Sequence, residues 1–355
     1  MTGLVFFQKV KISNYLCTQK MAICTKRYNN KMLQYRKFIF LVILLITSYF
    51  SGSDLNELFA QERPKPYINS RFITVDSVSF HFRTWNDSLK QPRGKVLLVH
   101  GFLGSTFSWR ENFDTLVKSN YRVVAIDLPG FGYSDRSLKV NQSHSNRARL
   151  LWDVLEILDR EDTAKWNLVG HSMGGGTVEA MALIKPERTQ TLTIVDGMVF
   201  LKNDDVQGAF VTLSRNKQYN KVFSSLVEKD VFNYKMIERL FRKNYGYTPD
   251  SSIVNGYLTP LLIEGSAESA LSVFSNSREM IPLDIRDLGN IPVLVIWGTK
   301  DRTIYPRTGK RFVRKVPTAK MKFIAGAKHD PMETDPEEFN EFLITFLNKK
   351  NNLIR

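Results

Sequence analysis

Cysteine is nearly absent from this sequence. The 355 residues include only Cys17 and Cys24, and both precede Met32. From Met32 onward the chain has no thiol, which excludes disulfides, a cysteine nucleophile and cysteine-ligated metal sites there. Histidine is also scarce, with five residues in all. A reaction that needs an imidazole base therefore has few candidates.

The sequence also lacks an apolar run of the roughly 18–20 residues that a membrane-spanning helix needs. The apolar run at residues 38–50 (FIFLVILLITSYF) is shorter. Arg36 and Lys37 precede it and small residues 51–53 follow it, an order typical of a secretory signal. We therefore expect a protein that is exported, periplasmic or extracellular, or anchored to the membrane through residues 38–50. Because a signal has a short basic region, we expect translation to start at Met32.

Acidic residues are missing from residues 1–53, although eight Lys and Arg lie there. The whole chain has a net charge of +15, with 50 Lys and Arg against 35 Asp and Glu, so 42 basic residues remain outside this segment. An excess of that size, spread over a folded domain, is more typical of a solubility feature than of a nucleic-acid-binding surface. We predict no nucleic-acid partner.

From about residue 70 the chain alternates apolar runs with amphipathic stretches, which is typical of a mostly parallel sheet covered by helices. An opening hairpin is expected at Arg71–Val75 and Val78–Trp85. Six later runs lack strict alternation, as strands buried on both faces do. These runs are Lys95–Val99, Arg122–Ile126, Trp166–Val169, Leu192–Val195, Val293–Trp297 and Met321–Ile324. The predicted fold class is α/β, with an eight-stranded sheet flanked by helices.

The alternation stops between residues 198 and 288, where Phe, Tyr, Lys and Arg recur at helical spacing. We interpret this segment as a helical cap inserted before the penultimate strand. Its aromatic residues are expected to pack the cap, with an acyl pocket as the alternative: Phe210, Phe223, Phe232, Phe241 and Tyr245. The predicted organisation is an extension and signal at 1–53, a core at 54–197, the cap at 198–288 and the rest of the core at 289–355.

Ser172 is the candidate nucleophile. It lies in GHSMG at residues 170–174, directly after a predicted strand and before a helix that opens with glycines. A tight strand-to-helix turn exposes the serine hydroxyl and needs glycine at its flanks, where a side chain would meet neighbouring backbone. The helix that follows directs its first amides toward any oxyanion formed there.

A serine hydroxyl needs a base within hydrogen-bond reach, and that base needs an acceptor to orient it. His329 follows the last predicted strand and is the candidate base. Asp301 follows the strand before it and is the candidate orienting acid, with Asp196, at the end of an earlier strand, as the rival. His81 and His144 are expected to be structural or exposed. The side chain of His171, within the turn itself, is expected beside the serine hydroxyl rather than facing it, and His100 lies at a strand end next to Gly101.

The backbone N–H groups of Phe102 and Met173 are the candidate oxyanion donors. Met173 follows the nucleophile, and Phe102 lies in the glycine-containing segment HGFLGS after a predicted strand. Two donors already in place stabilise the charge that develops on a carbonyl oxygen during attack.

Together these motifs resemble the α/β-hydrolase superfamily, in family order and over roughly residues 70–348. The segments that carry the resemblance are HGFLGS at 100–105, DLPGFGYSD at 127–135, GHSMGG at 170–175, WGTKDRTIYP at 297–306 and GAKH at 326–329. The resemblance implies the eight-strand topology, a cap over the site and no cofactor or metal. Serine at position 172 argues against epoxide hydrolases and haloalkane dehalogenases, which carry aspartate there.

The motifs do not separate carboxylesterases, monoacylglycerol lipases and carbon–carbon hydrolases of ring-cleavage products. We expect hydrolysis of medium-chain or lipid-like esters, because the predicted cap is apolar and the protein is expected outside the cytoplasm or on a membrane. The alternatives are carbon–carbon bond hydrolysis and, since fold alone does not fix function, a non-catalytic binding protein.

Overall fold

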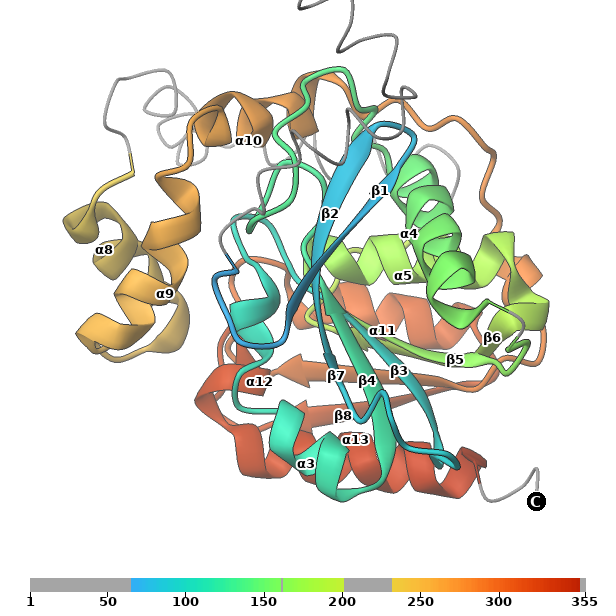
Figure 1. Cartoon of the computed structure of the whole chain (residues 1–355). Helices are drawn as coiled ribbons and strands as arrows, with labels where there is room; N and C mark the ends of the chain where they lie inside the picture. Colours follow the sequence, from blue (N-terminus) through green and yellow to red (C-terminus); the bar gives the residue numbers. More distant parts are fainter. Residues whose placement is uncertain (1–64, 161, 201–231, 352–355) are drawn as a thin grey trace, which may run out of the picture. The chain divides into compact units, whose positions relative to one another are not determined.

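An eight-stranded sheet forms the centre of the computed structural model, which describes residues 65–160, 162–200 and 232–351 (Figure 1). The strand order is β1-β2-β4-β3-β5-β6-β7-β8. β1 pairs antiparallel with β2, and β2 with β4, whereas the later pairs are parallel. The strands are β1 (Ser70–Val75), β2 (Val78–Trp85), β3 (Gly94–Val99), β4 (Tyr121–Ile126), β5 (Trp166–His171), β6 (Thr189–Val195), β7 (Val293–Gly298) and β8 (Ala319–Ile324). The predicted fold class is confirmed.

Helices cover both faces of the sheet and create two apolar cores. On one face lie α3 (Phe113–Lys118) and α13 (Pro336–Asn351), and on the other α4 (His144–Asp159), α5 (Met173–Ile184) and α11 (Pro306–Lys315). β5 and β7 are buried along their whole length, which is why their residues show no polar alternation. Because β5, β6 and β7 run parallel, their carboxyl ends meet at one edge of the sheet, where ligands bind in open α/β folds.

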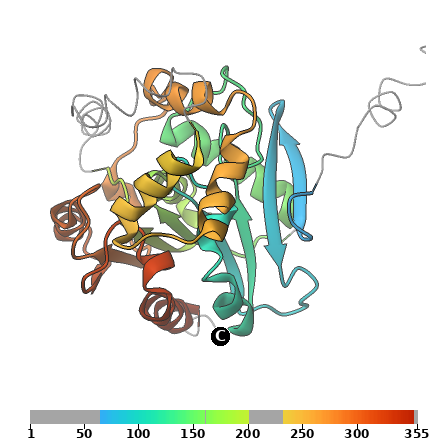
Figure 2. The ribbon, with the colours of Figure 1, turned by 90° about the vertical axis from the view of Figure 1, so that its left-hand side faces the viewer.

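Three cap helices lie between β6 and β7 in the sequence: α8 (Tyr234–Tyr245), α9 (Ser251–Leu261) and α10 (Ser266–Ser275). Asn233 and Asp250 begin α8 and α9 by accepting a backbone N–H three residues on, and Gly246 ends α8 in the left-handed conformation. Figures 1 and 2 show α8 and α9 side by side. The described parts of residues 198–288 contain no strand.

The remaining elements are short: η1 (Thr106–Trp109), η2 (Pro186–Arg188), η3 (Ile285–Leu288) and α12 (Pro331–Thr334). Of the predicted cap aromatics, Phe232, Phe241 and Tyr245 are buried, and the rings of Phe241 and Tyr245 contact each other. Phe210 and Phe223 lie outside the described residues, as do Cys17, Cys24, Met32 and the apolar run at 38–50. No helix in the described ranges has the length and hydropathy to span a bilayer.

Candidate active site

Ser172 lies at the junction of β5 and α5 with a positive φ of 51° and ψ −117°, a conformation that residues other than glycine rarely adopt. Backbone hydrogen bonds hold it there, because its N–H donates to the Val195 carbonyl and its own carbonyl accepts from Gly175 and Met198. A Cβ on Gly170 would lie 2.3 Å from the Gly174 carbonyl oxygen, so glycine is required at that flank. The strained turn presents the Ser172 hydroxyl at the carboxyl edge of the sheet.

His329 and Asp301 meet Ser172 at this edge. His329 Nε2 lies 3.0 Å from Ser172 Oγ, and His329 Nδ1 lies 2.9 Å from Asp301 Oδ2. Asp301 also accepts the backbone N–H groups of Thr303 and Ile304 on its other oxygen. With Nδ1–H donated to Asp301, Nε2 is free to accept the Ser172 proton. The three residues predicted for catalysis are thus within hydrogen-bond reach of one another.

The charges around His329 stabilise its protonated form, the imidazolium. Burial alone would lower the pKa of His329, but the Asp301 carboxylate outweighs burial and raises that pKa above 6.5, with Asp330 contributing in the same direction. The ring therefore takes up the Ser172 proton readily and is neutral, as a base must be, only above that pKa.

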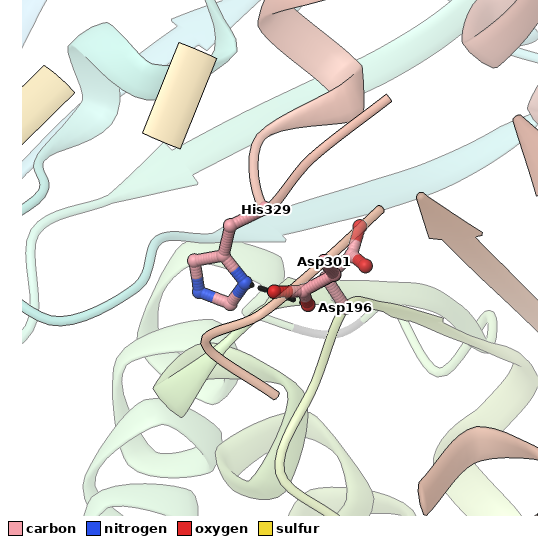
Figure 3. A group of neighbouring side chains, drawn as sticks. All are labelled: Asp196, Asp301 and His329. Atoms are coloured by element: carbon pink, nitrogen blue, oxygen red, sulfur yellow. Dashed lines mark hydrogen bonds and ion pairs between the residues drawn. The ribbon is translucent and has the colours of Figure 1, made fainter. Parts of the chain in front are cut away.

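Asp196, the rival acid in the sequence, lies beside Asp301 and does not replace it. Both follow neighbouring parallel strands, β6 and β7, and Figure 3 shows the two carboxyl groups together, with the hydrogen bond of His329 running to Asp301. Asp196 is fully buried, has φ 41° and accepts one backbone N–H, from Gly298.

Two adjacent buried carboxyl groups cannot both be ionised at low cost. Burial and then the neighbouring Asp301 carboxylate raise the pKa of Asp196 well above its usual value. Asp301 has three donors, including the imidazole, whereas Asp196 has one. We therefore place one proton on the pair, bound to Asp196, whose carboxyl O–H donates a hydrogen bond to Asp301.

Within the described residues, the one group of three or more His, Cys, Asp or Glu side chains close enough to share a metal ion is Asp196, Asp301 and His329, whose candidate atoms lie within 4.8 Å of one another. The His329 nitrogens are already bonded to Asp301 and Ser172. An ion bound through either nitrogen would have to displace the hydrogen bond made there, so the group suits proton sharing better than metal binding.

Residues 100–105, which we call the oxyanion loop, lie close to Ser172. A Cβ on Gly101 would lie 2.9 Å from Ser172 Cβ, so only glycine allows this approach. Among the described residues, no backbone acceptor is found for the N–H of Phe102 or Met173. Both groups are therefore available to an oxyanion. His100 braces the loop, with Nδ1 2.7 Å from the Gly101 carbonyl and Nε2 accepting from Leu128 N.

Two further histidines have positioning roles that sequence reasoning missed. His171 Nε2 lies 2.8 Å from the carbonyl oxygen of His329 and donates to it. This hydrogen bond holds the backbone of His329 in position. His81 bonds the fully buried Asp127, and Asp127 in turn accepts the N–H of Thr106, just after the oxyanion loop. The partners of both histidines are distant in sequence. The one local signal was that Asp127 lies in the motif DLPGFG.

Aromatic rings surround the oxyanion loop. The Phe102 ring meets those of Phe131 and Phe274 edge to face, with centroids 5.7 Å and 5.4 Å away. Phe274 comes from cap helix α10 and Phe131 from the loop after β4. This surrounding suits an apolar substrate group.

Glu333, on α12 just after His329, anchors the cap to the core. Its buried carboxylate accepts the hydroxyl of Tyr245 on α8 and that of Tyr257 on α9, and it pairs with Arg110. Tyr257 also lies 2.9 Å from Ser108 Oγ in η1. Nothing in the sequence singles out Glu333, because its three partners are 76 to 223 residues away.

We expect Glu333→Gln to lower the free energy of unfolding by about 1–3 kcal/mol, because half-buried Arg110 loses its buried anionic partner and keeps only exposed Glu111. Urea denaturation followed by fluorescence measures this loss. Tyr234→Phe, at an exposed cap tyrosine, is the matched control and should change stability by less than about 0.5 kcal/mol. Equal stability of Glu333→Gln and the native protein would contradict the anchoring role.

Comparisons with known proteins agree with this fold. The family model described as alpha/beta hydrolase fold matches residues 95–336. The chain is similar to an uncharacterised hydrolase of Bacillus subtilis strain 168, YugF, with 29% identity over 282 residues, 78% of this chain and 97% of the relative. A 2-hydroxy-6-oxononadienedioate/2-hydroxy-6-oxononatrienedioate hydrolase of Cupriavidus pinatubonensis is 26% identical over 289 residues, 78% of this chain and 95% of the relative.

Among solved structures, the crystal structure of a membrane phospholipase A, a bacterial virulence factor, superposes with a TM-score of 0.65 at 21% identity. The match covers 90% of this chain and 99% of that one. At this identity the likeness shows the shared fold alone.

Proposed function

This chain belongs to the alpha/beta hydrolase fold family and is a hydrolase, and from that premise we propose that it cleaves carboxylic esters through an acyl-enzyme on Ser172. The observation that carries the proposal is the continuous chain of hydrogen bonds from Ser172 Oγ through His329 to Asp301, at 3.0 Å and 2.9 Å. Such a chain activates a serine hydroxyl for attack on a carbonyl carbon.

The reaction has two halves. Ser172 Oγ attacks the ester carbonyl while His329 Nε2 takes its proton, and the N–H groups of Phe102 and Met173 stabilise the oxyanion. His329 then returns the proton to the leaving alcohol, which departs as the acyl-enzyme forms. Water, activated by the same imidazole, attacks the acyl carbon, and the acid and Ser172 are released. Asp301 stabilises the imidazolium in both halves.

We propose medium-chain or lipid-like acyl esters as the substrates. The aromatic rings of Phe102, Phe131 and Phe274 support this choice, because they favour an apolar group over a charged one. The proposed location, outside the cytoplasm or on the membrane through residues 38–50, would also bring the enzyme to such esters. The second candidate is carbon–carbon bond hydrolysis, which the name of the Cupriavidus pinatubonensis relative favours.

A substrate panel separates the two candidates. We expect the protein to hydrolyse p-nitrophenyl esters from acetate to palmitate with a preference for the middle of the series, and to leave a vinylogous 1,5-diketone carboxylate intact. Product release is measured by absorbance for both substrate types. Turnover of the diketone with slow ester hydrolysis would assign the second candidate. Failure on both, together with no labelling of Ser172 by a fluorophosphonate, would favour a binding protein.

A further inference from the structure

The positive charge of this protein is concentrated in two segments of the chain. Residues 1–53 hold eight Lys and Arg and residues 302–328 hold nine, and neither segment contains Asp or Glu. Of the 50 basic residues in the chain, 33 remain elsewhere, against all 35 acidic residues. The rest of the protein is therefore slightly acidic. The sequence-based interpretation of an excess spread over the domain is wrong for residues 302–328, which form α11, β8 and their loops.

Five cations of this segment form what we call the basic face. The basic face comprises Arg302, Arg307, Lys310, Arg311 and Arg314. All five are exposed, and none has an ion-pair partner among the described residues. The last four are spaced as i, i+3, i+4 and i+7 along α11, so they share one side of the helix.

Helix stability does not account for this arrangement. Arg307 lies in the first turn of α11, where the helix dipole disfavours a cation. Arg307 and Arg311, like Lys310 and Arg314, are like-charge pairs four residues apart, which destabilise a helix by a few tenths of a kcal/mol each. Lysines on the edge strand β8 can be explained as protection against strand pairing. Arg314 lies in the last turn of α11, where the helix dipole favours a cation, but Arg307, Lys310 and Arg311 have no such explanation.

The chemistry of the basic face points to phosphate groups. Three of the four α11 cations are arginines, whose planar guanidinium binds phosphate oxygens in pairs. Exposed Tyr305 adjoins the face, with the Arg307 guanidinium 4.7 Å from its ring centre. Tyrosine rings of this kind favour the boundary between lipid headgroups and water. The opposite side of α11 is buried on the sheet through Gly309 and Phe312, so contact would be by adsorption without insertion.

We propose that the basic face docks the folded domain on a bilayer surface that contains anionic phospholipid. Arg302 directly follows Asp301 in the chain, so the basic face begins next to the active-site edge of the sheet. The other basic segment, residues 1–53, contains the apolar run at 38–50. Both segments without Asp or Glu therefore suit a lipid surface. The apolar run at 38–50 would contribute nothing to nucleic-acid binding. Since the contact is electrostatic, salt weakens it.

The test uses the full chain and vesicles of phosphatidylcholine with or without phosphatidylglycerol. The variant R307Q/R311Q/R314Q removes three charges from the basic face. The control K90Q/K118Q/K165Q removes three charges from exposed lysines elsewhere on the domain. Each basic residue near an anionic surface contributes about fivefold to partition, so the first variant should bind phosphatidylglycerol vesicles about 100-fold more weakly. The control should match the native protein within a few-fold.

Three outcomes would overturn the proposal. The native protein could bind both vesicle types equally in low salt. The basic-face variant could keep its preference for phosphatidylglycerol, which would assign that preference to residues 1–53. The native protein could also bind duplex DNA more tightly than anionic vesicles at physiological salt. Thermal unfolding of both variants checks the fold, and because binding is measured without turnover, a failed ester assay leaves this result intact.

Discussion

Ser172→Ala is expected to lower kcat/KM for the best p-nitrophenyl ester by about 10⁴–10⁶-fold, because the variant has no nucleophile and keeps only binding and the oxyanion donors. The fold should be retained. The turn at residue 172 is held by backbone hydrogen bonds to Val195, Gly175 and Met198, and alanine keeps the Cβ. Initial rates and thermal unfolding, measured on the same preparation, separate lost chemistry from lost structure.

The matched control is Ser251→Ala, at an exposed serine on cap helix α9. It should hydrolyse the same ester at the native rate, and it should label fully with a fluorophosphonate, whereas Ser172→Ala should not label. Native activity in Ser172→Ala would reject the acyl-enzyme mechanism.

The sequence was sufficient to predict the sheet and the positions of the reacting groups. Buried parallel strands are continuous apolar runs, and their carboxyl ends share one edge, so the residues that follow β5, β7 and β8 had to lie near one another. Ser172, Asp301 and His329 are those residues. Glycine at 170 and 101 was a further local signal, since both positions exclude a side chain.

Contacts between distant segments were beyond that reasoning. His81 and Asp127 are 46 residues apart, and His171 and His329 are 158 apart. Nothing local distinguishes such a histidine from an exposed one, so His81 and His144 were taken as structural or exposed, and no contact was predicted for His100 or His171. His81, His100, His144 and His171 are in fact buried. Asp196 was treated as a competitor of Asp301, although two residues that end neighbouring strands can act together.

Asp301→Asn is expected to lower kcat/KM by about 10³–10⁴-fold at neutral pH. The amide keeps the shape of Asp301 but not the charge that stabilises the His329 imidazolium, and it can present an N–H to Nδ1 and so disfavour the tautomer with a free Nε2. Initial rates over a pH series measure the loss. A decrease of less than about tenfold would indicate that Asp196 supplies the negative charge in place of Asp301.

Asp196→Asn is the matched variant, and it distinguishes the two carboxyl groups. If Asp196 carries the shared proton, the amide replaces a neutral donor, accepts from Gly298 N as before, and changes kcat/KM by less than about tenfold. At low pH His329 gains a proton and activity falls, which is the acid limb of the pH profile. In Asp196→Asn the midpoint of this limb should keep its native value, above pH 6.5.

If Asp196 is ionised and the proton lies on Asp301, Asp196→Asn changes the pH profile differently. An ionised Asp196 would help to stabilise the imidazolium, so its loss would lower the pKa of His329 and move the acid limb to lower pH. A downward shift of about one unit corresponds to about 1.4 kcal/mol of lost charge stabilisation. An unshifted limb in Asp196→Asn, together with a large loss in Asp301→Asn, places the proton on Asp196 and the negative charge on Asp301. Asp196 is then a positioning residue that acts through Asp301.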